Sequence, residues 1–118
     1  MKKNNIIKNS KDFDRIIKKR NGISNKLFIL NIEDNNLNKA MFGITLTKKI
    51  GNAVIRNKLK RQTKSIIDNN KNIYQNNKNY IIIVKKEALN SNYQKMEQSL
   101  VSLFNIIKEK DNEKTEKK

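Results

Sequence analysis

The sequence contains no cysteine, histidine, proline or tryptophan, and only three of its 118 residues are glycine. Without cysteine the chain forms neither disulfide bonds nor thiolate metal sites, so we expect no disulfide-linked partner and a reducing compartment, the cytoplasm. Histidine and cysteine are also the usual general base and nucleophile of enzyme sites. Three glycines provide no glycine-rich phosphate loop. These absences argue against a catalytic site made by the protein's own side chains.

Acidic residues are few as well, eleven against 27 lysines and arginines. Asp12 and Asp14 stand two residues apart in an expected helix, so they do not face each other. Glu33 and Asp34 are expected in a loop, as a solubilising turn rather than a cation site. No group resembles the acidic cluster of a two-metal nuclease. A conventional nuclease is therefore the least favoured interpretation.

The chain also lacks long hydrophobic runs. No apolar segment approaches the length of a membrane-spanning helix, and the basic start is not followed by the apolar core of a secretory signal. We therefore expect no membrane partner. The formal net charge of +16 predicts an anionic partner, for which nucleic acid is the best candidate. The length suits one domain.

Hydrophobic periodicity predicts one small α+β domain with the order helix, strand, strand, helix, strand, helix. A first helix is expected to be capped by Ser10 and ended by Asn21 and Gly22. The strands are expected at residues 27–32, 41–47 and 80–84, and the later helices at residues 52–68 and 92–107.

The same patterns predict how these elements are connected and how the chain begins and ends. A polar loop, residues 33–39, should return the chain antiparallel into the second strand. The continuously apolar run at residues 80–84 is typical of a buried central strand. Residues 41–84 should form a strand–helix–strand unit, for which a right-handed crossover is the general preference. The ends, residues 1–9 and 108–118, are expected to be a basic mobile arm and a charged disordered tail.

The most informative stretch is residues 42–64. Phe42, Ile44 and Leu46 alternate with smaller residues as in a half-buried strand, and the period then becomes helical. One side of the helix should carry the apolar stripe Ile55, Leu59, Thr63, Ile66 and Ile67. The opposite side should carry Arg56, Asn57, Lys60, Arg61 and Lys64, with Lys58 on the flank and Lys48 and Lys49 just before the helix.

This basic stripe suits a phosphate backbone, because each contact releases condensed counterions. An ordinary solvated helix face is the alternative. Two observations favour a specific role. No carboxylate occurs between Asp34 and Asp68, and Arg56 and Arg61 are two of only four arginines in the chain. Arginine binds phosphate through two parallel hydrogen bonds, which lysine cannot do.

Residues 43–61 read Gly-Ile-Thr-Leu-Thr-Lys-Lys-Ile-Gly-Asn-Ala-Val-Ile-Arg-Asn-Lys-Leu-Lys-Arg, which closely resembles the signature of the protein subunit of bacterial ribonuclease P. Weaker similarity covers roughly residues 9–104. The resemblance implies a left-handed crossover. It also implies that an RNA subunit carries the active site and its Mg²⁺ ions, while the protein helps to bind precursor tRNA, from which the complex removes the 5′ leader.

The resemblance further implies two RNA-binding surfaces. The surface for the RNA subunit would comprise Lys48, Arg56, Asn57, Lys58, Lys60, Arg61 and Lys64, with Lys58 where the family usually has arginine. The leader-binding cleft, between the first helix and the sheet, would comprise Phe13, Ile17, Ile29, Asn31, Thr45 and Lys49. Ile17 and Asn31 replace residues that are commonly aromatic in the family. Phe13 would then be the only stacking platform, unless it is an ordinary core aromatic.

Strand alternation agrees with part of the cleft that the resemblance implies. Ile29 and Asn31 should share one face of the sheet, as should Gly43 and Thr45, whereas Phe28, Leu30, Phe42 and Ile44 should face the helices as core.

Two other classes of protein compete with this interpretation. A basic RNA-binding protein of ribosomal or structural type would have the same charge but not the motif at residues 48–61. An RRM would need aromatic residues that alternate on its central strands, and residues 39–44, with Phe42 alone, lack the second and third rings of that signature.

Overall fold

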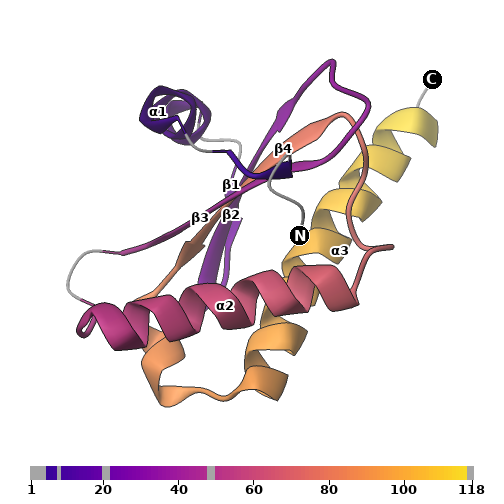
Figure 1. Cartoon of the computed structure of the whole chain (residues 1–118). Helices are drawn as coiled ribbons and strands as arrows, with labels where there is room; N and C mark the ends of the chain where they lie inside the picture. The colour runs from indigo at the N-terminus through magenta and orange to yellow at the C-terminus, as the bar shows by residue number, and fades with distance from the viewer. Residues whose placement is uncertain (1–4, 8, 20–21, 48–49, 117–118) are drawn as a thin grey trace.

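The computed structural model describes residues 5–7, 9–19, 22–47 and 50–116, with side chains described as far as residue 109 (Figure 1). Three helices, four strands and a short 3₁₀ helix follow one another in this part of the chain. In order they are α1 (Ser10–Lys18), β1 (Gly22–Ser24), β2 (Phe28–Asp34), β3 (Met41–Leu46), α2 (Ala53–Asn69), β4 (Lys78–Val84), η2 (Lys86–Asn90) and α3 (Tyr93–Glu116).

The four strands form one mixed sheet in the order β1-β2-β4-β3. β4 pairs antiparallel with β2 and parallel with β3. The continuously apolar run therefore lies in one of the two interior strands, as predicted. The loop after β2 does reverse the chain into β3, but β4 is inserted between these two strands.

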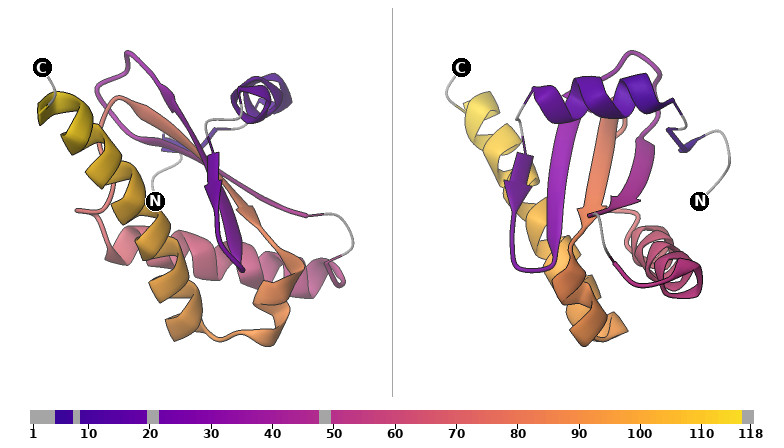
Figure 2. Two further views of the ribbon diagram at one scale, coloured as in Figure 1. Left: turned by 180° about the vertical axis from the view of Figure 1, so that it is seen from behind. Right: turned by 90° about the vertical axis from the view of Figure 1, so that its left-hand side faces the viewer.

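The helices cover both faces of the sheet, with α2 and α3 on one face and α1 on the other (Figure 2). Alternation along β4 explains these two layers. Tyr80, Ile82 and Val84 are buried in the main core with residues of α2 and α3. Ile81 is buried in a second, smaller core with Ile16 of α1. The predicted faces are confirmed: Phe28, Leu30 and Phe42 are buried in the main core, and Ile44 packs against it.

The connection from β3 through α2 to β4 is left-handed. In the right-hand view of Figure 2 both strands run downward, β3 lies to the right of β4, and α2 lies on the face opposite α1. The general preference for right-handed crossovers is therefore overridden here. The hand implied by the family resemblance is the one observed.

The first helix differs from its prediction at both ends. Its N-cap is Asn9, whose side chain accepts a hydrogen bond from the Lys11 N–H at 2.9 Å, so Ser10 already belongs to the helix. It ends at Lys18, and Gly22 begins the edge strand β1, which was not predicted. Gly22 pairs with Asn31 of β2. A β-carbon at position 22 would lie 2.3 Å from Asn31 Oδ1, so glycine is used here for close approach and not to end a helix.

The two ends of the chain are also more ordered than expected. Ile6 forms a parallel bridge with Phe42, the Ile7 N–H donates to the Phe42 carbonyl at 2.8 Å, and Ile7 is buried. Residues 5–7 thus extend the sheet beside the edge strand β3 and protect part of its backbone. At the other end α3 continues through Glu116, into the expected tail.

Candidate nucleic-acid interface

The α2 helix positions the basic residues of the motif. Asn52 caps it by accepting a hydrogen bond from the Ile55 N–H at 3.1 Å. Gly51 precedes the cap with a φ of +48°, a left-handed conformation that favours glycine. The Gly-Asn pair of the motif therefore ends the turn and starts the helix. Lys48 and Lys49, predicted for the two RNA-binding surfaces, lie outside the described residues.

The predicted basic stripe divides into two parts. Asn57, Lys58 and Arg61 are exposed. Arg56, Lys60 and Lys64, spaced four residues apart, are half-buried. Residues at this spacing form one row along a helix. We call these three residues the flank row, because they lie beside the apolar side of α2 and not opposite it. The prediction that all five stripe residues face away from the apolar side was wrong for this row.

The apolar side of α2 is also shorter than predicted. Leu59, Thr63, Ile66 and Ile67 are buried, but Ile55 is 37% exposed. The preceding Val54 is 74% exposed. The first turn of α2 therefore projects beyond the core, which leaves Arg56 and its neighbours accessible from outside the domain.

The charge of α2 has little local compensation. The ion pairs between described side chains involve Arg15, Lys19 and Lys78, and none includes a cation of α2. The first turn of α2 contains no acidic residue. Cations in a first turn face the positive end of the helix dipole, which disfavours them. An anionic ligand at this end would relieve both effects.

Those residues of the predicted leader-binding cleft that the structure describes lie on the α1 face of the sheet. Strand pairing arranges them in two rows, Asn31–Ile81–Gly43 and Ile29–Ile83–Thr45. Phe13 and Ile17 of α1 pack against the cluster formed by Ile7, Ile16 and Ile81. The second row remains half-buried, as do Phe13 and Ile17. The structure thus brings Phe13, Ile17, Ile29 and Thr45 to one face.

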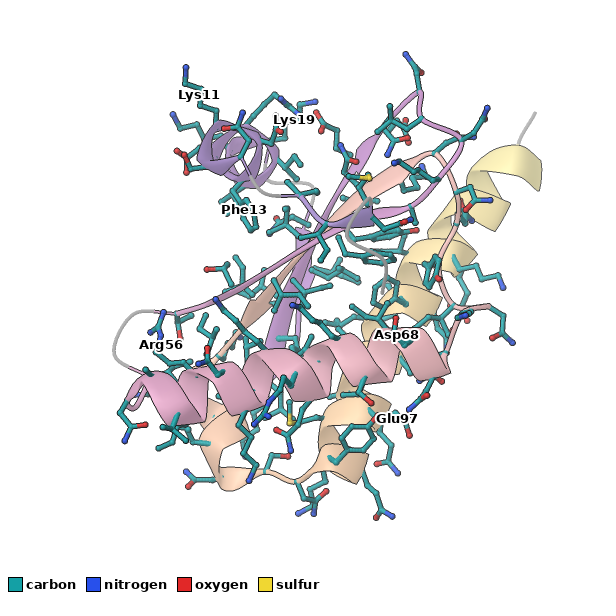
Figure 3. All side chains as sticks on the ribbon, viewed as in Figure 1. Lys11, Phe13, Lys19, Arg56, Asp68 and Glu97 are labelled. Carbon is teal, nitrogen blue, oxygen red and sulfur yellow. The ribbon has the colours of Figure 1, made fainter. Side chains whose placement is uncertain are left out.

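Phe13 points from α1 toward the sheet (Figure 3). Its ring lies directly against the β3 backbone at Gly43, because a β-carbon there would be 2.5 Å from Phe13 Cζ and 2.8 Å from Ile81 Cδ1. Phe13 is therefore packed as a core residue on one side while it remains half-buried overall. The two interpretations of this residue, core and stacking platform, are compatible.

Two further residues change the composition of this face. Asn31 lies on it as predicted but is only 5% exposed. Ile83 of β4 lies between Ile29 and Thr45 and was not predicted for the site. The sequence feature that could have identified Ile83 is the alternation of side chains along β4. This alternation places Ile81 and Ile83 on one face of the strand and Tyr80, Ile82 and Val84 on the other.

A network of charges attaches α1 to the sheet. Arg15 donates two hydrogen bonds to Glu33, Nε to Oε1 at 3.1 Å and Nη2 to Oε2 at 2.9 Å. Lys19 Nζ donates to Oε1 at 2.6 Å, and Asn79 Nδ2 to Oε2 at 3.1 Å. The Arg15 hydrogen bonds, supported by those of Lys19 and Asn79, lower the pKa of Glu33 to about 2. Glu33 is therefore a strand residue that pairs with the side chains of Arg15 and Lys19. Its prediction as a solubilising loop residue was wrong.

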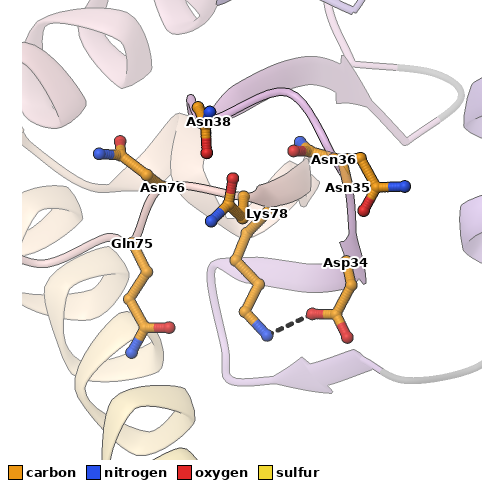
Figure 4. Close-up of a pocket in the computed structure, with 8 residues that line it drawn as sticks. Asp34, Asn35, Asn36, Asn38, Gln75, Asn76 and Lys78 are labelled. Atoms are coloured by element: carbon orange, nitrogen blue, oxygen red, sulfur yellow. Dashed lines mark hydrogen bonds and ion pairs between the residues drawn. The ribbon is translucent and has the colours of Figure 1, made fainter.

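A hollow lies at one end of the sheet, between the loops at residues 34–38 and 75–78 (Figure 4). Its volume is about 510 Å³, and asparagine and glutamine amides form most of its lining. Lys78 forms an ion pair with Asp34 across it. None of the predicted site residues lies there.

Neither a metal cluster nor a membrane span is found in the described part of the chain. It holds no group of three or more acidic, histidine or cysteine residues that could bind a metal ion. None of its helices is both long enough and apolar enough to cross a membrane.

Comparison with known proteins agrees with this fold and with the motif on α2. The family model for Ribonuclease P matches residues 1–108. The ribonuclease P protein component of Mycoplasma mycoides subsp. mycoides SC is 40% identical over 109 residues, which cover 92% of this chain and 100% of the relative. That of Streptococcus pneumoniae serotype 4 is 33% identical over 92% of this chain and 88% of its own. Among solved structures, a mutant RNase P protein of Staphylococcus aureus superposes with a TM-score of 0.80 at 32% identity, covering 90% of each chain. The chain therefore belongs to the family of ribonuclease P protein components.

Proposed function

We propose that this ribonuclease P protein component binds the catalytic RNA subunit through α2 and the 5′ leader of precursor tRNA through the α1 face of the sheet. It would work in the cytoplasm, as part of the enzyme that releases the leader. The flank row and the exposed residues Asn57, Lys58 and Arg61 would contact the RNA subunit. The observation that carries the proposal is the uncompensated charge of α2.

Support for α2 as the RNA-subunit surface comes from its charge and its rigidity. The helix is fixed to the core by Leu59, Ile66 and Ile67, so the backbone that carries its cations has a constant spacing. Cations on a preorganised helix bind phosphates with a smaller loss of backbone entropy than cations on a flexible segment. Arg56 and Arg61 can each bind a phosphate through two hydrogen bonds.

Support for a leader-binding site comes from the apolar α1 face. Single-stranded RNA is bound by stacking its bases on aromatic or apolar side chains. Phe13 offers a ring, while Ile17, Ile29 and Ile83 offer half-buried aliphatic surface. With a single ring, this face should bind leaders with little discrimination between bases.

The chemistry would come from the RNA subunit and its Mg²⁺ ions. Hydrolysis of a phosphodiester by metal ions needs a water activated by the metal and a stabilised leaving oxygen. The role of the protein is then to hold the substrate and to neutralise phosphates near the RNA.

Reconstitution tests this proposal. The purified protein is added to the cognate RNA subunit at low Mg²⁺, and release of the leader from precursor tRNA is measured. We expect the protein to accelerate cleavage strongly, and mature tRNA to accumulate with a uniform 5′ end. An equal rate without the protein, or with an unrelated basic protein of similar charge, would contradict the proposal.

A further inference from the structure

A small pocket lies at the edge of the sheet beside β3, where the two surfaces described above meet. Four segments of the chain form its walls: residues 6 and 7, α1, β3 and α2. Its volume is about 190 Å³. Pockets for drug-sized ligands have volumes of about 300–1,000 Å³, so this pocket has room for one small ring system only.

The pocket combines an apolar interior with two cations. Ile6, Ile7, Phe13 and Ile44 provide apolar walls, while Lys60 and Lys64 of the flank row line the side formed by α2. Neither lysine takes part in the ion pairs of the described side chains. A ligand that fits this pattern has a flat apolar body and an anionic group attached to it.

We propose that this pocket binds a single unstacked nucleotide of RNA, with the base between the apolar walls and its phosphate held by Lys60 and Lys64. The inference rests on the proposed function, because it takes the nucleotide to be part of an RNA that α2 binds. The flank row leads to the pocket: Arg56 lies one turn before Lys60, and Lys64 one turn after it. A phosphate backbone that follows this row passes beside the pocket, where one base can turn inward.

The aromatic residues of the pocket have different roles. The Phe42 ring is stacked on Tyr80, with a centroid distance of 5.5 Å, and meets Tyr74 edge-on at 4.8 Å. These contacts fix Phe42 as a rigid wall. Phe13 has no ring partner among the described side chains and is half-buried, so its ring is the one that a base can contact. Since Phe13 also borders the α1 face, a nucleotide here would lie between the two RNA-binding surfaces.

Methyl NMR of the full chain, with labelled isoleucine, tests the proposal. The probes are AMP, ribose 5-phosphate, which lacks the base, and hexyl phosphate, which replaces the base by an aliphatic chain. The samples contain trimethylamine N-oxide, because it favours the folded state without supplying an anion. We expect AMP to shift the methyl signals of Ile6, Ile7 and Ile44 saturably. The other two probes should bind at least about fivefold more weakly, because stacking on the ring is lost.

Variants make the test specific. Ile6→Trp should fill the pocket and abolish the AMP shifts, whereas Ile106→Trp, at a 42% exposed position of α3, should leave them unchanged. Replacing Lys60 and Lys64 with glutamine should weaken AMP binding without changing the position of saturated shifts. This lysine variant decides the question if Ile6→Trp does not fold.

Any one of four results would overturn the inference. Ribose 5-phosphate that binds as tightly as AMP would show a phosphate site without a base pocket. Hexyl phosphate that binds as tightly would show an unselective apolar site. AMP shifts confined to Ile17, Ile29 and Ile83 would place the base on the α1 face. Affinity for the RNA subunit, measured on the same protein, separates the pocket from the proposed function. If the protein binds the RNA subunit normally but AMP causes no shifts in the pocket, only the present inference is overturned.

Discussion

The attachment of α1 to the sheet should make the stability of this protein depend on acid pH through one carboxylate. Glu33 is 10% exposed and receives hydrogen bonds from Arg15 and Lys19, which hold its pKa near 2 instead of 4.5. Because the folded pKa lies below the unfolded one, the folded state binds fewer protons. The stabilisation by Glu33 is therefore complete above pH 4.5 and is lost as the pH falls from 4.5 through 2.

The magnitude follows from the same contacts. The fall in pKa from 4.5 to about 2 sets a ceiling of about 3 kcal/mol in the free energy of unfolding. Arg15 and Lys19 are 50% and 47% exposed, so solvent screens part of this energy. We therefore expect Glu33 to contribute about 1–2 kcal/mol near neutral pH.

This contribution is measured by urea unfolding of the wild type and of Glu33→Gln. The measurement is made near neutral pH and again near pH 2, where Glu33 of the folded wild type is half-protonated. The wild type should lose about 1–2 kcal/mol more than the variant between the two conditions, because other carboxylates titrate equally in both proteins. Asp34→Asn is a matched control, since the Asp34 side chain is 83% exposed. Equal losses in wild type and Glu33→Gln, or an equally large effect of Asp34→Asn, would refute the reasoning.

Two other predictions follow from the surfaces described above. Phe13→Ala should reduce affinity for precursor tRNA with a long 5′ leader by about 1–3 kcal/mol and spare mature tRNA, as measured by equilibrium binding; equal losses for both RNAs would indicate that Phe13 acts only through the core. Because the net charge of +16 opposes compaction, sulfate should increase the helical circular dichroism signal more than chloride at equal ionic strength, and equal responses would exclude a specific anion site.

The sequence predicted the central part of the fold because local pattern and tertiary position agree there. A continuously apolar run needs cover on both faces, and β4 has α1 on one side and α2 and α3 on the other. The change from period two to helical period at residues 42–59 likewise identified β3 and α2.

The features that sequence reasoning missed depend on contacts between distant residues. β1 has only three residues, and Gly22 belongs to a strand because it pairs with Asn31. Residues 6 and 7 are ordered by Phe42, far along the chain. Glu33 looked like a loop residue until the fold brought Arg15 and Lys19 to it. The hand of the crossover is set by which face of the sheet α2 covers, and no local pattern contains that information.

The candidate site shows the same limit. Periodicity gives the angle of Lys60 and Lys64 around the helix axis, but it does not show that β3 and residues 6 and 7 lie beside them. Both the half-burial of these lysines and the pocket that they line depend on contacts with those neighbouring segments. Ile83 was not predicted for the site, because a continuously apolar run does not show which of its residues stay partly exposed on the α1 face.

The claim that the flank row binds the RNA subunit is tested most directly by the salt dependence of that binding. The variant replaces Arg56, Lys60 and Lys64 with alanine, and the control variant removes the same charge from Lys26, Lys86 and Lys95, which are exposed elsewhere. Affinity for the RNA subunit is measured over a range of salt concentrations. We predict that the slope of log affinity against log salt falls by about 2–3 in the flank-row variant, since each phosphate contact contributes about 0.7–0.9, and changes little in the control. Equal slopes in the flank-row variant and the wild type, or an equal change in the control, would contradict the account.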